Sequence, residues 1–268
     1  HKTNAGQLRR LQGWAKIARN ISEWDYWIQY SPNDKFATPY APIDCIPVDL
    51  ATFARNHVSS IYVECENTET TSFYALKRWL GFQLMVNPFQ RAEPLIRTFL
   101  EGYYGKAAPK MAEYLRFMQK SIAACDANLS AMKCYDRPYL TLDFYLTCER
   151  LLDEAEALAA GDAKALLHVR RERVPVDAGF YCMWEQLIER RPATAEPPVT
   201  RDRLLERYEA YRLEQMAEFR PPSAIAKGKE SLAQQIHEMR GLSIVEARRK
   251  LPPPRVRGCW NGASRAMA

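Results

Sequence analysis

Two short segments near the start of the chain carry acidic and aromatic side chains in close alternation. Residues 21–28 read Ile-Ser-Glu-Trp-Asp-Tyr-Trp-Ile, and residues 60–66 read Ser-Ile-Tyr-Val-Glu-Cys-Glu. Glycoside hydrolysis uses a pair of carboxyl groups, one to protonate the leaving oxygen and one to attack the sugar or activate water. The candidate catalytic residues are therefore Asp25, Glu64 and Glu66.

Aromatic and amide side chains flank these carboxylates and predict a surface that binds a sugar. Aromatic rings pack on the apolar face of a sugar ring, while polar groups bind its hydroxyls. The candidate substrate-binding residues are Trp24, Tyr26, Trp27, Tyr62 and Asn67. Each candidate also has a structural alternative, because strand-end carboxylates often cap loops and aromatic residues often fill cores. If the candidates act together, we expect Asp25 and Glu64 to face one pocket.

The apolar pattern predicts that both segments are strands with a helix between them. Alternation in residues 60–66 places Ile61, Val63 and Cys65 on one face, and the tyrosine and glutamates on the other. Apolar residues from Val48 to His57 predict the intervening helix. A strand–helix–strand order favours parallel strands. Their carboxyl ends then meet at one edge, which is where the active sites of β/α barrels lie.

Most of the remaining chain has the periodicity of helices. One predicted helix precedes the first strand, and the others follow the second strand. Their ranges are 6–20, 73–86, 95–104, 111–124, 139–160, 163–190, 201–219 and, more weakly, 231–250. Pro175 is expected to kink or break the helix in which it lies. We interpret the charged run from Arg170 to Arg173 as a solvated helix face.

Charge and composition narrow the range of partners. The net charge is +6, and residues 201–268 supply the whole excess, with 14 Lys and Arg against 8 Asp and Glu. No nucleic-acid-binding motif accompanies this basic segment, so we expect no nucleic-acid partner. No apolar run reaches the roughly 18 residues of a membrane span, so we expect no membrane partner.

The spacing of the seven cysteines and four histidines matches no zinc site, and the chain has no phosphate-binding glycine loop. We therefore expect no metal and no cofactor. The cysteines are expected to be reduced and mostly buried.

The order of several segments resembles a bacterial family of glycoside-hydrolase-like proteins, itself described as a domain of unknown function and related to α-glucuronidases. The similarity covers residues 8–190. The segments that carry it are Trp24-Asp25-Tyr26, the proline-rich loop that follows, residues 62–66, Asn87-Pro88, residues 99–108 and residues 170–176. The chain departs from the family at residues 67–71, where a glycine-rich turn is usual and Asn-Thr-Glu-Thr-Thr stands instead.

The resemblance implies an α/β fold followed by mostly α structure. Residues 1–108 would be the last strands and helices of a (β/α)8 (TIM) barrel, and residues 109–250 an α-helical domain. Independently of the resemblance, the composition of residues 251–268, with a run of prolines at 252–254, predicts a flexible tail. We expect the chain to be a fragment whose partners include the upstream domains of the same polypeptide. The full-length protein is expected to be secreted or periplasmic, although the sequence itself gives no localisation.

On this basis we expect a carbohydrate-active, glycoside-hydrolase-like protein that acts on or binds sugars derived from polysaccharides. The alternative is a non-catalytic helical interaction module of a larger protein. A large exposed apolar patch without a pocket at the strand ends would favour that alternative. A third hypothesis is that the basic C-terminal segment binds nucleic acid, which would make binding strongly dependent on salt.

Overall fold

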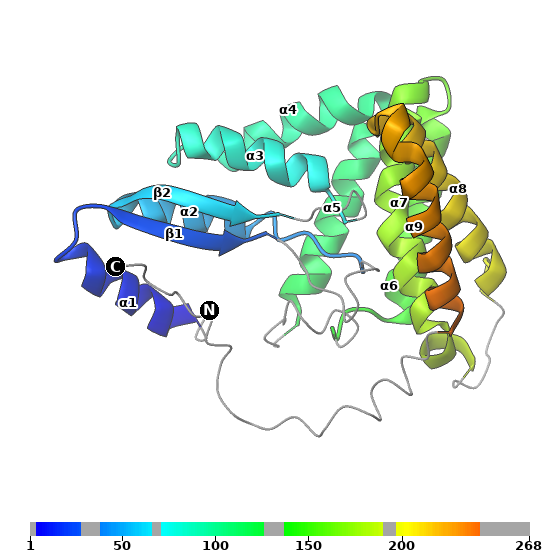
Figure 1. Ribbon diagram of the computed structural model, residues 1–268, viewed down its shortest axis with the longest axis horizontal. Coiled ribbons are helices and arrows are strands. Elements are labelled where there is room, and N and C mark those ends of the chain that lie inside the picture. The colour runs from blue at the N-terminus through cyan, green and yellow to red at the C-terminus, as the bar shows by residue number, and fades with distance from the viewer. Residues whose placement is uncertain (1–3, 28–37, 66–70, 126–136, 190–196, 242–268) are drawn as a thin grey trace.

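The computed structural model describes residues 4–27, 38–65, 71–125, 137–189 and 197–241 (Figure 1). The N-terminal elements are α1 (Ala5–Ala15), β1 (Ile21–Tyr26), α2 (Cys45–Arg55), β2 (Val58–Glu64), α3 (Tyr74–Val86) and α4 (Ala92–Tyr104). A short turn, η2 (Gly105–Ala107), leads to α5 (Ala108–Ala123), α6 (Leu142–Ala159) and α7 (Ala163–Trp184). A π-helical turn, η3 (Glu185–Glu189), extends α7, and α8 (Arg201–Phe219) and α9 (Pro222–Gly241) follow. The predicted tail, residues 251–268, lies outside the described residues.

Strands β1 and β2 pair in parallel in one sheet, as their order around a helix predicted. Trp24 pairs with Tyr62, and Tyr26 pairs with Glu64. Ile61, Val63 and Cys65 pack against the core, where α2 contacts β2, while the intervening Tyr62 and Glu64 are on the opposite face. The predicted alternation of β2 is therefore confirmed. Figure 1 shows α2 behind the sheet and α3 running alongside it.

Helices α6 to α9 form a bundle beside the sheet, with α5 standing between the two parts (Figure 1). Helix α7 packs against α4, α6 and α8, so nearly every side chain from Ala165 to Trp184 is at least partly buried. Polar side chains start three of these helices: Thr141, Asp162 and Thr200 each accept a hydrogen bond from a backbone N–H of the first turn. Helix α7 continues through Pro175, so of the expected kink or break the break is excluded, and a kink stays a prediction.

The charged run in α7 is buried, so its interpretation as a solvated face is wrong. Arg171, Glu172 and Arg173 all lie in the interior because α7 has neighbours on several sides. The charge is tolerated because it is paired. Arg173 binds three carboxylates of α6: Glu149 at 3.3 Å, Asp153 at 2.6 Å and Glu156 at 2.5 Å. Arg207 of α8 binds Glu149 at 2.8 Å and also contacts Asp177.

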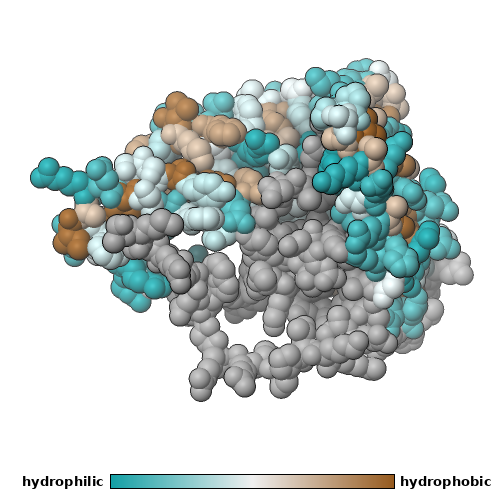
Figure 2. Space-filling view, in the orientation of Figure 1, coloured by the Kyte–Doolittle hydropathy of each residue, from teal (hydrophilic) through white to brown (hydrophobic). Residues whose placement is uncertain are grey.

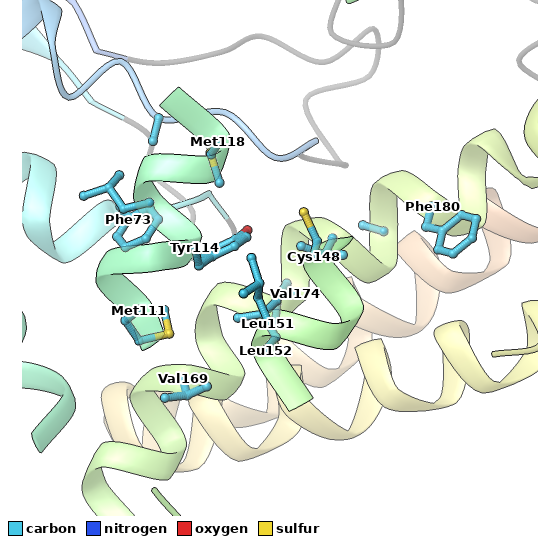
Figure 3. Close-up of a cluster of buried hydrophobic side chains, with 14 of the residues drawn as sticks. Phe73, Met111, Tyr114, Met118, Cys148, Leu151, Leu152, Val169, Val174 and Phe180 are labelled. Atoms are coloured by element: carbon cyan, nitrogen blue, oxygen red, sulfur yellow. The ribbon is translucent and has the colours of Figure 1, made fainter. Parts of the chain in front are cut away.

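One hydrophobic cluster runs through both parts of the molecule, from Trp27 at the end of β1 to Met239 in α9. Figure 3 shows its centre, where Tyr114 of α5 points toward Leu151 and Cys148 of α6. The boundary expected near residue 108 coincides with the start of α5, but the core is continuous across it.

The coarse fold expectation is confirmed, since the described chain is mostly helical with a small parallel sheet. The described residues contain two strands, so the barrel itself stays a prediction.

All five cysteines in the described part are free thiols. Only Cys148 and Cys182 are buried, so the expectation of mostly buried cysteines is wrong for Cys45, Cys65 and Cys125. In the same part of the chain, no helix has the length and apolar character needed to cross a membrane.

Candidate functional site

The face of the sheet turned away from the core carries an exposed group of aromatic rings. Trp24 and Tyr62 are 58% and 59% exposed, and Tyr26 is 39% exposed. The rings of Trp24 and Tyr62 meet edge to face with centroids 4.6 Å apart, and those of Trp24 and Tyr26 lie 6.3 Å apart at 28°. The parallel register produces this arrangement, because paired residues project their side chains to the same side. These rings form a continuous aromatic surface rather than isolated exposed residues.

A carboxylate lies at the edge of this aromatic surface. The indole Nε1–H of Trp24 donates a hydrogen bond to Oε2 of Glu64 over 3.2 Å. At the other end of the strands, the hydroxyls of Ser22 and Ser60 are 2.6 Å apart. We call the set Ser22, Trp24, Tyr26, Ser60, Tyr62 and Glu64 the open face. It offers aromatic rings, hydroxyls and a carboxylate on one side of the sheet.

Asp25 lies on the other side of the sheet from Glu64. It pairs with Val63, whereas Glu64 pairs with Tyr26, and neighbouring residues on a strand point to opposite faces. Oδ1 of Asp25 accepts a hydrogen bond from the backbone N–H of Tyr26 over 2.8 Å, and Oδ2 accepts one from Nε1–H of Trp27 over 2.8 Å. The expectation that Asp25 and Glu64 share one pocket is therefore wrong.

Asp25 belongs to a group of acidic side chains between the sheet and α2. Burial, and then the charge of Asp25, raises the pKa of Asp49 to about 6. The same two causes raise the pKa of Glu23. Sequence reasoning missed this group, because Asp49 meets the strand only once α2 folds against the sheet. The described His, Cys, Asp and Glu side chains form no group of three or more that could hold a metal ion.

Trp27 connects the sheet to α3 and lies away from the open face. Its side chain is buried, and its ring packs so closely on Gly81 that a Cβ there would lie 2.2 Å from Cη2 and Cζ3. The buried ammonium of Lys77 donates a hydrogen bond to the Trp27 carbonyl over 3.1 Å. Trp27 therefore anchors the end of β1. The sequence feature that marks the contact of Trp27 with α3 is the pair Lys77 and Gly81, four residues apart in an otherwise apolar helix.

Two predicted site residues, Glu66 and Asn67, lie outside the described residues. Among the described candidates, the open face gathers Trp24, Tyr26, Tyr62 and Glu64, and it separates them from Asp25 and Trp27. Sequence reasoning did not single out Ser22 and Ser60, which complete the open face. The signal that could have found them is the alternation of side chains along each strand, combined with the register that pairs Ser22 with Ser60.

A comparison with protein families places the sheet within a matched region. A family model described as a domain of unknown function (DUF4838) matches residues 1–116, which is less than half of the chain. No curated protein and no solved structure matches the chain. The matched range contains both strands and the whole open face, and the family description assigns no activity to it.

Proposed function

We propose that the open face binds a carbohydrate, and that the chain is part of a glycoside-hydrolase-like protein. The exposed aromatic surface formed by Trp24, Tyr26 and Tyr62 supports this function best. Ligand sites combine aromatic lining with a few placed polar groups that fix orientation. Here Glu64 provides an acceptor for sugar hydroxyls, and its bond to the Trp24 indole holds it beside the ring.

The barrel expected from the resemblance is a finer form of this proposal. Parallel sheets are normally buried on both faces. In this structure, helix α2 contacts the sheet on one side, and the opposite side exposes large aromatic rings. A sheet of more strands, closed on itself, would turn the open face toward the barrel interior. The parallel pairing and the one-sided helical cover are what support this proposal.

Hydrolysis by this protein would need a second carboxyl group near Glu64. The two carboxyl groups of glycoside hydrolases lie about 5 to 9.5 Å apart across the scissile bond. Asp25 is on the wrong face to serve with Glu64 and instead orients Trp27. The sequence pattern of residues 60–66 leads to the expectation that Glu66 shares a face with Tyr62 and Glu64, and Glu66 lies outside the described residues. We therefore propose Glu64 as a sugar ligand or catalytic carboxylate and Glu66 as the candidate for its partner.

A second candidate function, a protein interaction module, is favoured by a different surface. Phe82, Met85 and Val86 near the end of α3, and Phe89 after it, are all exposed. Figure 2 shows brown side chains gathered at the upper left, over this end of α3. Exposed apolar patches of this kind commonly mark interaction sites. This surface is separate from the open face, so the two functions can be tested apart.

The carbohydrate proposal is tested by titrating the protein with a panel of neutral, amino and uronic oligosaccharides in a calorimeter. We expect at least one class to bind. Trp24→Ala should weaken its binding roughly tenfold, because truncating a central aromatic anchor commonly costs more than about 1 kcal/mol. Glu64→Gln should weaken binding less, since the amide oxygen still accepts hydrogen bonds.

Phe82→Ala is the matched control, because it removes an exposed ring from α3 and leaves the open face intact. It should bind the sugar as the unmodified chain does. If no class of the panel binds, or if both alanine variants weaken binding equally, the open face is not a sugar site.

A further inference from the structure

A buried carboxylate joins three helices at the point where the sheet meets the bundle. Glu172 of α7 is 1% exposed. Its Oε2 accepts a hydrogen bond from the backbone N–H of Phe73 over 2.6 Å, and its Oε1 accepts one from the hydroxyl of Tyr104 over 3.0 Å. Both carboxylate oxygens are therefore used, one at the start of α3 and the other on α4.

The backbone at the start of α3 is strained where Glu172 binds it. Phe73 has φ 51° in the left-handed region, which a side chain larger than glycine seldom adopts. Such a strained residue persists only when its surroundings hold it. Here the holding contacts are the bond to Glu172 and the stacking of the buried ring on Tyr114, with centroids 5.6 Å apart. The geometry of α3 thus depends on a group that belongs to α7.

One turn further along α3, Lys77 carries the connection to the sheet. Its side chain is buried, and its Nζ donates hydrogen bonds to the carbonyl of Trp27 at 3.1 Å and to Oγ1 of Thr71 at 3.5 Å. Its charge favours the ionised form of Glu172. A continuous set of contacts therefore runs from Glu172 through α3 and Lys77 to Trp27, whose indole binds Asp25.

We propose that Glu172 and Lys77 form a charge-sensitive joint through which helix α7 positions the carboxyl end of β1. The groups that face Glu172 from the helices around it are Lys77 of α3, Tyr104 of α4, Tyr114 of α5 and, on α7 itself, Arg171. When Glu172 gains a proton, the attraction to Lys77 is lost and one oxygen becomes a donor. The start of α3 and the Trp27 carbonyl must then adjust together.

This change falls near neutral pH. Burial raises the pKa of Glu172 to about 7, although the Phe73 N–H, Arg171, Tyr104 and Lys77 all favour the carboxylate. In an unfolded chain the pKa of glutamate is about 4.3. Between these values the folded protein binds the extra proton, so this group's stabilising contribution is full below the unfolded pKa and is lost as pH rises through about 7.

The test is a titration of two assigned signals in the ¹H–¹⁵N NMR spectrum of the full chain. The Phe73 amide reports directly on Glu172, and the Trp27 indole reports on the end of β1. We expect both signals to show a step with a shared midpoint at about 7. The indole, which binds Asp25, can show a further step near 6 from Asp49, whereas the Phe73 amide should not. If the indole signal shows no step near 7 while the Phe73 amide titrates, the proposed joint is refuted. This result can be obtained with the unmodified protein alone.

Glu172→Gln should abolish the Phe73 titration and the step near 7 in the Trp27 signal, because the amide has the same shape and no proton to exchange near neutral pH. An indole step near 6 that persists in this variant belongs to Asp49, which interacts with Asp25. Lys77→Met should keep the Phe73 titration, move its midpoint to higher pH and uncouple the Trp27 signal. Glu206→Gln, at an exposed position of α8, is the control and should change neither signal. Persistence of the Phe73 titration in Glu172→Gln would assign it to another group and refute the proposal. The outcome is independent of whether the open face binds sugar.

Discussion

At the scale of single residues, the bundle depends on a charge that has no access to water. Arg173 is completely buried, and each of its nitrogens contacts a carboxylate of α6. Removing an ion from water costs several kcal/mol, and only close pairing with further hydrogen bonds offsets that cost. Two of the carboxylates have other partners as well: Glu149 binds Arg207, and Glu156 accepts a hydrogen bond from Tyr211 over 2.9 Å. The network therefore joins α6, α7 and α8.

Replacing Arg173 by Met should destabilise the protein by about 3 kcal/mol, because Glu149 and Glu156 each lose one cation in the interior and keep only Arg207 and Arg170. Urea unfolding measures this loss. Arg203→Met is the matched control, since Arg203 makes a 3.8 Å contact with Glu206 where both side chains are exposed. An exposed pair of this kind contributes about 1 kcal/mol or less. Equal losses in the two variants would mean that the buried network does not stabilise the bundle.

The residue scale also shows what the sequence could and could not predict about the site. The alternation of β2 was readable because apolar and polar residues alternate strictly there. In β1 acids alternate with aromatic rings, but the half-buried positions are the acids Glu23 and Asp25 and the exposed ones are Trp24 and Tyr26, so hydrophobicity assigns the two faces the wrong way round. Only the pairing of Trp24 with Tyr62 fixes them. For this reason the sequence grouped Asp25 with Glu64, and the structure separates them.

At the scale of elements, α3 is the helix that holds the sheet to the rest of the protein. Its first turn is bound by Glu172, its second turn contributes Lys77, and its third contacts the Trp27 ring at Gly81. Glycine is unfavourable in a helix interior by about 1 kcal/mol relative to alanine. At position 81 it is required by space, since the ring occupies the volume of a Cβ.

Gly81→Ala should therefore destabilise the protein by about 1 to 3 kcal/mol, because overpacking outweighs the gain in helix propensity. Gly102→Ala in α4 is the matched control, as a Cβ there meets no atom within 4 Å. It should stabilise the protein by up to about 1 kcal/mol. Thermal unfolding of both variants gives the comparison. A stabilised Gly81→Ala variant would show that Trp27 does not pack on α3 as described.

At the scale of the whole molecule, the sheet and the bundle rely on each other. The helices were predictable from apolar periodicity, but the central place of α7 was not, because its charged run masks its burial. The parallel pair was predictable from the order of elements. The exposure of one face of this pair was not predictable. Among the described residues, the exposed large apolar side chains lie before residue 90, with the exceptions of Leu158 and Leu213. The segment that contains β1, α2 and β2 buries too little apolar surface by itself. Its stability must therefore come largely from contacts made through α3, α4 and α5.

This dependence predicts that the described parts unfold together. One core cluster spans them, and Glu172 and the stacked pair of Phe73 and Tyr114 cross the junction. In urea, tryptophan fluorescence and far-ultraviolet circular dichroism should give one coincident transition, which is the usual test of cooperativity. Gly81→Ala, on the sheet side, and Arg173→Met, in the bundle, should each shift both signals equally. If instead each variant moves a separate transition, the sheet and the bundle are independent folding units and the junction does not couple them.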